Sequence, residues 1–430
     1  MTVTLVPAPP APARPDPLGV LGVPGEINLD HAASAPCARA AADAVAELLP
    51  WYASVHRGAG ALSRRCTLAY ERARQTVADF LGARPTDHVI FTRNTTDAVN
   101  LLARALPTGT TVVTFGGEHH ANLVPWPRGS VRLPVPDSPT GAVRSLDAAL
   151  GELARDARPG LPVLVAVTGA SNVTGECWPV AELARVAHRH GARILVDAAQ
   201  LAPHAPVDVT ALDLDYVALS GHKLYAPFGA GVLAGRADWL DAAPPYLPGG
   251  GATSHVGAAT HDVRWATGPA RHEGGTPNLL GAVALAAVCA ALTAADRTAL
   301  HAREQALLTR LRAGLAAVPD VVELRTFGPE APRVGIVSFV VAGRDSAEVA
   351  AHLAARHRIG VRDGLFCAHP LTRRLLTEAA ARTPGAALPP TALRASIGLN
   401  TTPHEIDTLL TALTTLPLPL PPSPLPVEAR

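Results

Sequence analysis

The clearest chemical signal in the sequence is a single lysine. The chain has 430 residues with 37 lysines and arginines together, and only Lys223 among them is a lysine. Arginine can replace lysine on a solvated surface, but its guanidinium group stays protonated and cannot act as a nucleophilic amine. A Schiff base with a carbonyl cofactor requires such an amine. Lys223 is therefore a candidate nucleophile, and chance survival of one surface lysine is the alternative.

Polar residues accompany Lys223 at the ends of two predicted strands. The apolar run 193–196 leads into Asp197, and the run 216–219 leads into Ser220, His222 and Lys223. Open α/β sheets bind ligands at the carboxyl ends of their strands, so these side chains should meet at one edge. A carboxylate there suits a protonated pyridine nitrogen, which makes the ring an electron acceptor. The alternative for Asp197 is a helix N-cap. Ser220 and His222 could donate hydrogen bonds to a phosphate.

Two more predicted strand ends carry groups that suit the same ligand. Thr95 and Thr96 follow the run 89–92 and open a helix, where free N–H groups and the helix dipole favour an anion. Plain helix capping is the alternative there. His119 follows the run 111–114 and could stack on a pyridine ring and move protons. The adjacent His120 lacks the helical spacing of a zinc pair, so no metal is expected.

Two amide side chains follow further strand ends. Asn172 comes after the run 163–167, and Gln200 comes shortly after Asp197. Either could donate to a hydroxyl oxygen on the ring, and either could instead be a turn residue. No G-x-G-x-x-G sequence follows the first strand and no Walker A sequence is present, which disfavours nucleotide cofactors.

Strand-like and helix-like stretches alternate along most of the chain. The pattern predicts βαβ units around a mainly parallel sheet sandwiched by helices, in a large domain over residues 19–285. Helical stretches at 297–317 and 346–356 flank a strand at 336–341, which predicts a smaller α+β domain over residues 286–415. Residues 19–30 are expected to pack with the smaller domain. The proline-rich ends, 1–18 and 416–430, are expected to be disordered tails.

Composition narrows the class of protein. A formal net charge of +1 gives no reason to expect a nucleic-acid or membrane partner. No stretch approaches the ~20 apolar residues of a membrane span, and the first residues lack the basic-then-apolar order of a signal peptide. The five cysteines are odd in number and form no CxxC pair. These features predict a cytoplasmic protein in a reducing compartment.

The order of the motifs resembles that of class V (fold type I) enzymes that use pyridoxal 5′-phosphate (PLP). Within that class, the chain is similar to SUF-type cysteine desulfurases and selenocysteine lyases, from about Asn28 to about Leu413. The motifs that carry the resemblance are Leu29-Asp30-His31-Ala32-Ala33, Val55-His56-Arg57-Gly58, Arg93-Asn94-Thr95-Thr96-Asp97, Glu118-His119-His120-Ala121-Asn122, Ser171-Asn172-Val173-Thr174-Gly175, Asp197-Ala198-Ala199-Gln200, Ser220-Gly221-His222-Lys223-Leu224-Tyr225, Gly249-Gly250-Gly251, Glu273-Gly274-Gly275-Thr276-Pro277-Asn278 and Leu393-Arg394-Ala395-Ser396.

The resemblance implies a role for each matching residue. Lys223 would hold PLP as a Schiff base, with Asp197 at the ring nitrogen and His119 stacked on the ring. Arg394 would bind the substrate α-carboxylate, because a planar guanidinium group can donate two parallel hydrogen bonds to it. Arg362 and Ala33 would lie beside the substrate. Thr276 would reach the phosphate from a partner subunit, which implies a homodimer with shared active sites. The phosphate contacts implied are Thr95, Thr96, Ser220, His222 and Thr276.

The reaction depends on one cysteine. The segment from Arg362 to Ala368 resembles the desulfurase sequence Arg-x-Gly-x-x-Cys-Ala, with Cys367 at the position of the cysteine that takes sulfur from the substrate as a persulfide. Asp363 is a departure, because a nearby negative charge opposes thiolate formation. The insert 383–390 is a second departure that could cover the site, alter partner docking or signal another substrate.

We therefore expect desulfuration of L-cysteine or a related amino acid, with a sulfur-acceptor protein as a further partner. The alternatives are another class V reaction, namely C–S β-elimination, transamination or epimerisation, and a scaffold without catalysis. A scaffold would have no use for the retained Lys223.

Overall fold

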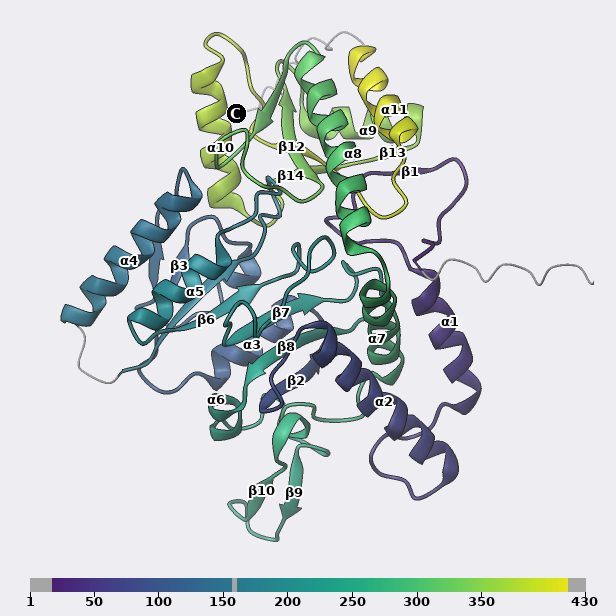
Figure 1. The fold of residues 1–430 in the computed structure, drawn as a ribbon, viewed down its shortest axis with the longest axis vertical. Helices are drawn as coiled ribbons and strands as arrows, with labels where there is room; N and C mark the ends of the chain where they lie inside the picture. Colours follow the sequence, from purple (N-terminus) through teal and green to yellow (C-terminus); the bar gives the residue numbers. More distant parts are fainter. Residues whose placement is uncertain (1–17, 157–160, 417–430) are drawn as a thin grey trace, which may run out of the picture.

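The predicted strands build one seven-stranded sheet in the computed structural model, which describes residues 18–156 and 161–416. The strands lie in the order β2-β8-β7-β6-β5-β3-β4 (Figure 1), and β8 alone runs against the other six. The expected mainly parallel sheet is confirmed. The strands are β2 (Asp87–Thr92), β3 (Thr111–Phe115), β4 (Val131–Leu133), β5 (Val163–Thr168), β6 (Arg193–Asp197), β7 (Tyr216–Ser220) and β8 (Gly231–Arg236).

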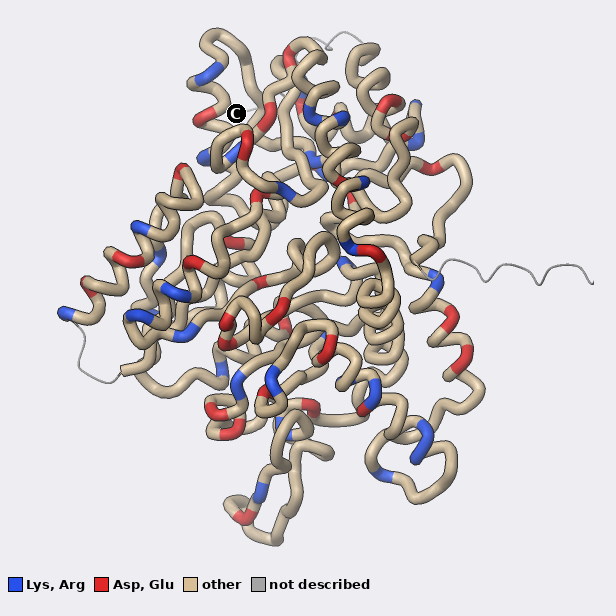
Figure 2. The backbone as a smooth tube through the Cα atoms, viewed as in Figure 1, with Lys and Arg blue, Asp and Glu red and all other residues tan. Residues whose placement is uncertain are grey.

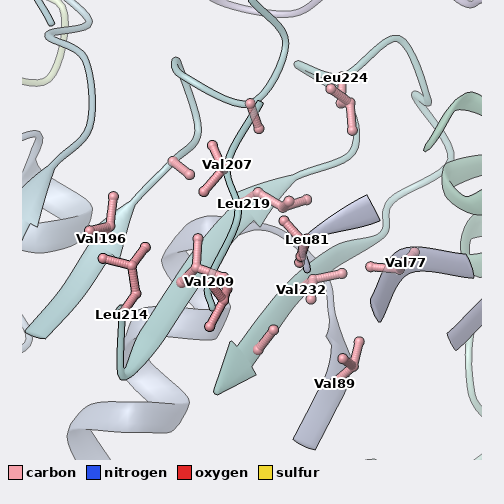
Figure 3. Packing of buried hydrophobic residues seen from close by; sticks show 14 of the residues in the cluster. Val77, Leu81, Val89, Val196, Val207, Val209, Leu214, Leu219, Leu224 and Val232 are labelled. Atoms are coloured by element: carbon pink, nitrogen blue, oxygen red, sulfur yellow. The ribbon is translucent and has the colours of Figure 1, made fainter. Parts of the chain in front are cut away.

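Both faces of this sheet are buried, which explains why its strands are continuous apolar runs rather than alternating ones. Successive residues point to opposite faces, so Val196 and Leu219 face one core while Leu195 and Ala218 face another. Figure 3 shows the first core, where strand side chains meet those of the following loops. The helices on the first face are α1 (Arg39–Leu48), α2 (Ala61–Phe80), α4 (Pro139–Asp156), α5 (Val180–Arg189) and α7 (Leu279–Ala294), and those on the second are α3 (Thr95–Ala105) and α6 (Ala237–Ala242).

A second, antiparallel sheet lies above the first in Figure 1, in the order β11-β12-β15-β14. Helices pack on it around a separate core that includes Leu311, Phe339 and Ile406. The predicted strand 336–341 and helix 297–317 coincide with β12 and α8. The elements are α8 (Arg297–Ala317), β11 (Val321–Leu324), β12 (Ile336–Val341), α9 (Ser346–His357), β13 (Ile359–Gly360), β14 (Arg362–Gly364), α10 (His369–Arg382), β15 (Ala392–Ser396) and α11 (Pro403–Thr414).

The N-terminal segment joins the smaller part of the molecule. Strand β1 (Ile27–Asn28) pairs in parallel with β13, and Asp30 bridges to Ser396. The domain boundary expected after residue 285 falls inside α7, whose Leu285 and Leu292 both belong to the core of the larger sheet. Most of the two tails expected at the chain ends, residues 1–17 and 417–430, lies outside the described residues.

Three short helices and one hairpin complete the described chain. The hairpin consists of β9 (Thr253–Val256) and β10 (Val263–Trp265), and it projects from the bottom of the molecule in Figure 1. The short 3₁₀ helices are η1 (Leu49–Trp51), η2 (His120–Asn122) and η3 (Gly268–Arg271). Positive and negative residues are interspersed over both parts (Figure 2), in keeping with the small net charge.

Within residues 18–156 and 161–416, no single helix is both long and apolar enough to cross a bilayer. Helices α7 and α8 meet those criteria only as a pair, and they are bent by 92° at their junction.

Candidate active site

A cavity of about 420 Å³ opens where the carboxyl ends of the large sheet face the smaller one. Its volume falls in the range of sites for small molecules and cofactors, roughly 300–1,000 Å³. Every site residue predicted from the sequence lines it except Thr276. The predicted residues in its walls are Ala33, Thr95, Thr96, His119, Asn172, Asp197, Gln200, Ser220, His222, Lys223, Arg362, Cys367 and Arg394.

Lys223 reaches the cavity from a tight turn after β7. A Cβ at Gly221 would lie 2.6 Å from the carbonyl oxygen of Ala230, so only glycine fits where the turn passes β8. Strand β6 pairs in parallel with β7, with Asp197 opposite Ala218. The parallel pairing brings Asp197 and Lys223 to the same sheet edge, as predicted from their positions after successive strands.

Burial makes Lys223 a usable nucleophile. Desolvation lowers the pKa of its amine to about 8, and the repulsion by Arg394 acts in the same direction, while Asp197 opposes the shift. A substantial fraction of the amine is therefore neutral near neutral pH, which the ordinary lysine pKa does not allow.

Asp197 is fully enclosed and keeps one oxygen available. Its Oδ1 accepts the N–H of Ala199 at 3.0 Å. Burial raises the pKa of the carboxyl, while the Ala199 N–H and the Lys223 charge act against that rise. A cation placed beside Asp197 in the cavity would favour the ionised carboxylate, so this position suits a protonated ring nitrogen.

His119 enters the cavity as a neutral imidazole. Burial is the main reason that its pKa falls to about 3, and the charge of Lys223 adds to the effect. Its Nδ1 accepts the N–H of Ala121 at 3.0 Å, which fixes the ring and leaves the proton on Nε2. The ring can therefore offer a flat face and one N–H to a ligand.

The predicted anion cradle forms between β7 and α3. The Ser220 hydroxyl lies 2.8 Å from both the backbone nitrogen and the hydroxyl of Thr95. Asn94 caps α3 by accepting the N–H of Asp97 at 3.0 Å, and Thr96 is exposed on the first turn. His222 approaches from the Lys223 turn. Hydroxyl groups at a helix N-terminus favour a phosphate.

The two predicted amides already have partners in the protein. The amide nitrogen of Asn172 donates to the Phe366 carbonyl at 2.7 Å, and that of Gln200 donates to the Ala32 carbonyl at 2.8 Å. Each NH₂ group has one further hydrogen that can face the cavity. The structure thus gives both residues a role in joining segments in addition to the predicted ligand contact.

Two of the three guanidinium nitrogens of Arg394 donate hydrogen bonds within the protein. One guanidinium nitrogen, Nη1, donates to the carbonyl of Asn172 at 2.9 Å, and Nη2 donates to Oδ1 of Asp30 at 3.1 Å. The side chain is buried, and its Nε has neither accessible surface nor a hydrogen-bond partner among the described residues. Each Nη group has a second N–H, and a guanidinium group in a cavity wall suits a carboxylate ligand.

Cys367 lies in an unusual turn between β14 and α10. Phe366 and Cys367 both have φ of +53°, a left-handed conformation that costs about 1–2 kcal/mol for a non-glycine residue. The Phe366 ring is buried with its centre 5.1 Å from the Arg394 guanidinium carbon. The Cys367 side chain is exposed at the cavity. Contacts around the turn must offset its backbone strain.

The insert 383–390 and Thr276 both lie away from the cavity. The insert 383–390 joins α10 to β15, its Ala387 carbonyl accepts the N–H of Gly343, and none of its residues lines the cavity. It therefore does not cover the site. Thr276 is exposed and lines a separate cavity with Tyr70 and Tyr246, so one chain alone does not bring it to the site.

Sequence reasoning missed three residues that the structure brings to the site. Asp30 holds Arg394, and His369 lines the cavity two residues after Cys367. Glu118, next to His119 in the chain, is fully buried, where desolvation raises its pKa to about 8 while it accepts hydrogen bonds from Asn122 and Thr168. Asp30 and Glu118 stand in recognised motifs, which were usable signals, whereas the place of His369 depends on the fold. Among the described ranges, no cluster of three or more His, Cys, Asp or Glu side chains could hold a metal ion.

Comparison with known proteins gives a consistent result. The family model "Aminotransferase class-V" matches residues 27–409. A cysteine desulfurase of Dickeya dadantii is 39% identical over 398 residues, which covers 90% of both chains. A cysteine desulfurase of Escherichia coli O127:H6 is 35% identical, over 90% of this chain and 92% of the relative.

Solved structures are similar over the same span. The apo structure of a cysteine desulfurase from Thermococcus onnurineus superposes with a TM-score of 0.78 at 32% identity, covering 90% of this chain and 94% of the other. An Escherichia coli cysteine desulfurase in an S-sulfonic acid form gives a TM-score of 0.73 at 32% identity, with the same coverage. With its sheet order, its cavity at the strand ends and this similarity over nearly the whole described length, the chain belongs to the class-V aminotransferase family.

Proposed function

We propose that the protein is a PLP-dependent cysteine desulfurase that transfers sulfur from L-cysteine to Cys367. The observation that carries the proposal is the presence of three groups in one cavity: the buried amine of Lys223, the guanidinium group of Arg394 and the exposed thiol of Cys367. Lyases and aminotransferases have no need for the thiol. The desulfurase relatives support the same reaction.

The cavity residues fit PLP. Lys223 would hold the cofactor covalently, Asp197 would face its ring nitrogen, His119 its ring, and Thr95 and Ser220 its phosphate. The Arg394 guanidinium group in the cavity wall would bind a substrate carboxylate. When bound, PLP supplies an electron sink that weakens the bonds at the substrate α-carbon.

The protein's own groups then carry out the sulfur transfer. Arg394 binds the α-carboxylate and orients the substrate, and Lys223 and His119 are placed to move protons near the α-carbon. The Cys367 thiolate attacks the substrate sulfur, so an S–S bond forms and the substrate C–S bond breaks, with its electron pair remaining on carbon. Protonation of that carbon gives alanine. The balance is L-cysteine plus enzyme thiol to L-alanine plus enzyme persulfide.

Product analysis with purified protein tests the proposal. The protein is incubated with a panel of amino acids and a reductant, and products are identified by mass spectrometry. Cysteine should give equal amounts of alanine and sulfide. Pyruvate from cysteine would instead establish β-elimination, and a keto acid would establish transamination; either result without alanine overturns desulfuration.

Arg394→Lys should raise KM for cysteine by roughly 10- to 100-fold and change kcat much less. Lysine keeps the charge but cannot hold Asp30, Asn172 and a carboxylate at once, and a charged hydrogen bond of this kind is worth about 1.5–3 kcal/mol. Steady-state kinetics measure both constants. Arg325→Lys, outside the cavity walls, is the control. An Arg394→Lys enzyme with KM within twofold of wild type would remove Arg394 from substrate binding.

We further propose a homodimer that uses the surface at the junction of α1 and α2. The side chains of Leu49, Trp51, Tyr52, Leu62 and Leu68 are exposed there by 52, 41, 51, 47 and 56%. Neighbouring apolar side chains of this size on a surface favour association. A second copy would also supply the Thr276 hydroxyl that one chain does not bring to the cavity. A cytoplasmic location and a sulfur-acceptor protein complete the proposal.

Combining Leu62→Glu with Leu68→Glu should convert the dimer to monomer at micromolar concentration, because charged side chains oppose burial of that surface. Multi-angle light scattering measures the mass, with the wild type expected at twice the chain mass. Val23→Glu, at a position 68% exposed elsewhere, is the control. A double variant that remains as dimeric as wild type would place the interface elsewhere.

A further inference from the structure

The turn that carries Cys367 needs support from outside itself. Its two left-handed residues, Phe366 and Cys367, are not glycine, so the isolated turn favours other conformations. Helix α10 follows at once, and its N-cap, Ala368, has no side chain that could accept a hydrogen bond. The first N–H groups of a helix require acceptors that the helix cannot provide. Both needs are met from the larger part of the molecule.

His120 meets these needs with two of its groups. Its backbone N–H donates to the Cys367 carbonyl at 2.8 Å. Its ring Nε2 accepts the backbone N–H of His369, the first residue of α10, at 3.4 Å. The ring also packs edge-on against the His369 ring, with 4.5 Å between centres. The imidazole therefore caps a helix that belongs to the other sheet.

The segment that presents His120 is itself well anchored. Asn122, in the same short helix η2, donates to Glu118 at 2.8 Å, and the Trp126 indole donates to the Asn122 carbonyl at 2.9 Å. His119 begins this helix and accepts the Ala121 N–H. One rigid segment thus places His119 in the cavity and His120 against the nucleophile's turn.

We propose that His120 is a positioning residue for Cys367, holding the turn so that the thiol stays at the cavity. The ring contributes through Nε2 as an acceptor, not through volume alone. Arg394 is held by Asp30 and Asn172, and its hydrogen bonds do not involve His120. Loss of the His120 ring should therefore slow the sulfur transfer and leave substrate binding unchanged. The kinetic part of this inference rests on the proposed function, whereas the effect on the turn does not.

Three substitutions at His120 test whether the hydrogen-bond acceptor Nε2 or the bulk of the ring supports the turn. Glutamine places an oxygen near the position of Nε2, asparagine places one near Nδ1, and leucine has no acceptor. His120→Leu and His120→Asn should lower kcat roughly three- to tenfold, as expected for loss of one hydrogen bond, with KM within twofold of wild type. His120→Gln should restore kcat to within about twofold.

Alkylation of Cys367 in the substrate-free holoenzyme provides a readout that does not require turnover. Iodoacetamide labelling of the Cys367 peptide, followed by mass spectrometry, should be faster in His120→Leu and His120→Asn and unchanged in His120→Gln. The cofactor absorption band and thermal melting verify that each variant is folded and loaded. Wild-type labelling and kcat in His120→Leu overturn the proposal, and so does a His120→Gln variant as impaired as His120→Leu.

The two proposals fail in different ways. If wild-type protein forms no alanine from cysteine, the desulfurase proposal is wrong, and the labelling rates still decide whether His120 holds the turn. If alanine forms normally but the labelling rates of the three variants equal that of wild type, only the role of His120 is wrong.

Discussion

Lys223→Ala should abolish turnover and remove the covalently bound cofactor. In the proposed function the buried amine attaches PLP, and alanine cannot replace it in that attachment or in proton transfer, so the rate should fall by roughly 10³-fold or more. The absorption band at the violet edge of the visible spectrum should be lost or shifted. Spectra and turnover of the same preparation measure both effects.

Lys223→Arg is the matched control, because it keeps the positive charge and lacks a nucleophilic amine. It should be as inactive as Lys223→Ala. Substantial turnover by either variant, or a wild-type absorption band in the alanine variant, would contradict the assignment of Lys223. Thermal melting verifies that the variants are folded.

The lowered pKa of Lys223 also predicts how cofactor attachment depends on pH. With a pKa of about 8, about a tenth of the amine is neutral at pH 7, compared with about 0.03% at the ordinary value of 10.5. Only the neutral amine reacts, so the rate of PLP uptake by apoprotein should rise about tenfold from pH 7 to pH 9 and then level off. A rise of about a hundredfold without a plateau would indicate an unshifted lysine.

Cys367→Ala should abolish formation of alanine and sulfide from cysteine while the cofactor band remains. In the proposed function the thiolate accepts the substrate sulfur, and water in its place has no comparable nucleophilicity, so a loss of roughly 10²-fold or more is expected. Product assays and the absorption spectrum of the same variant measure the two effects. Mass spectrometry of wild type after incubation with cysteine should detect one additional sulfur on Cys367.

Cys37→Ala is the corresponding control, since Cys37 does not line the cavity. It should retain wild-type activity. If Cys367→Ala turns over cysteine to alanine at the wild-type rate, the persulfide route is wrong and another acceptor must be sought.

Much of the fold was predictable because the local signals agree with it. The runs that became β5, β6 and β7 are apolar apart from Arg193 at the start of β6, as expected for strands buried on both faces. Helix α8 coincides with its predicted range, and β12 does as well. Boundaries were less predictable: the domain boundary expected after residue 285 falls inside α7, because that helix continues to Ala294 and its Leu292 packs in the core of the larger sheet.

For the site, the sequence was enough to select the candidate residues. The lone Lys223, Asp197 after one strand, Thr95 at a helix start and the motif around Cys367 can be recognised without coordinates, because residue type and position relative to a strand end limit what each can do. All of these side chains line one cavity.

The hydrogen bonds that support those residues, and the pKa of Lys223, depend on the tertiary structure. The fall in the pKa of Lys223 comes from burial, which depends on the whole fold. The support of Arg394 by Asp30 and the clamp of His120 on the Cys367 turn join residues separated by more than two hundred positions. No local pattern encodes such contacts, because they arise where the two sheets meet.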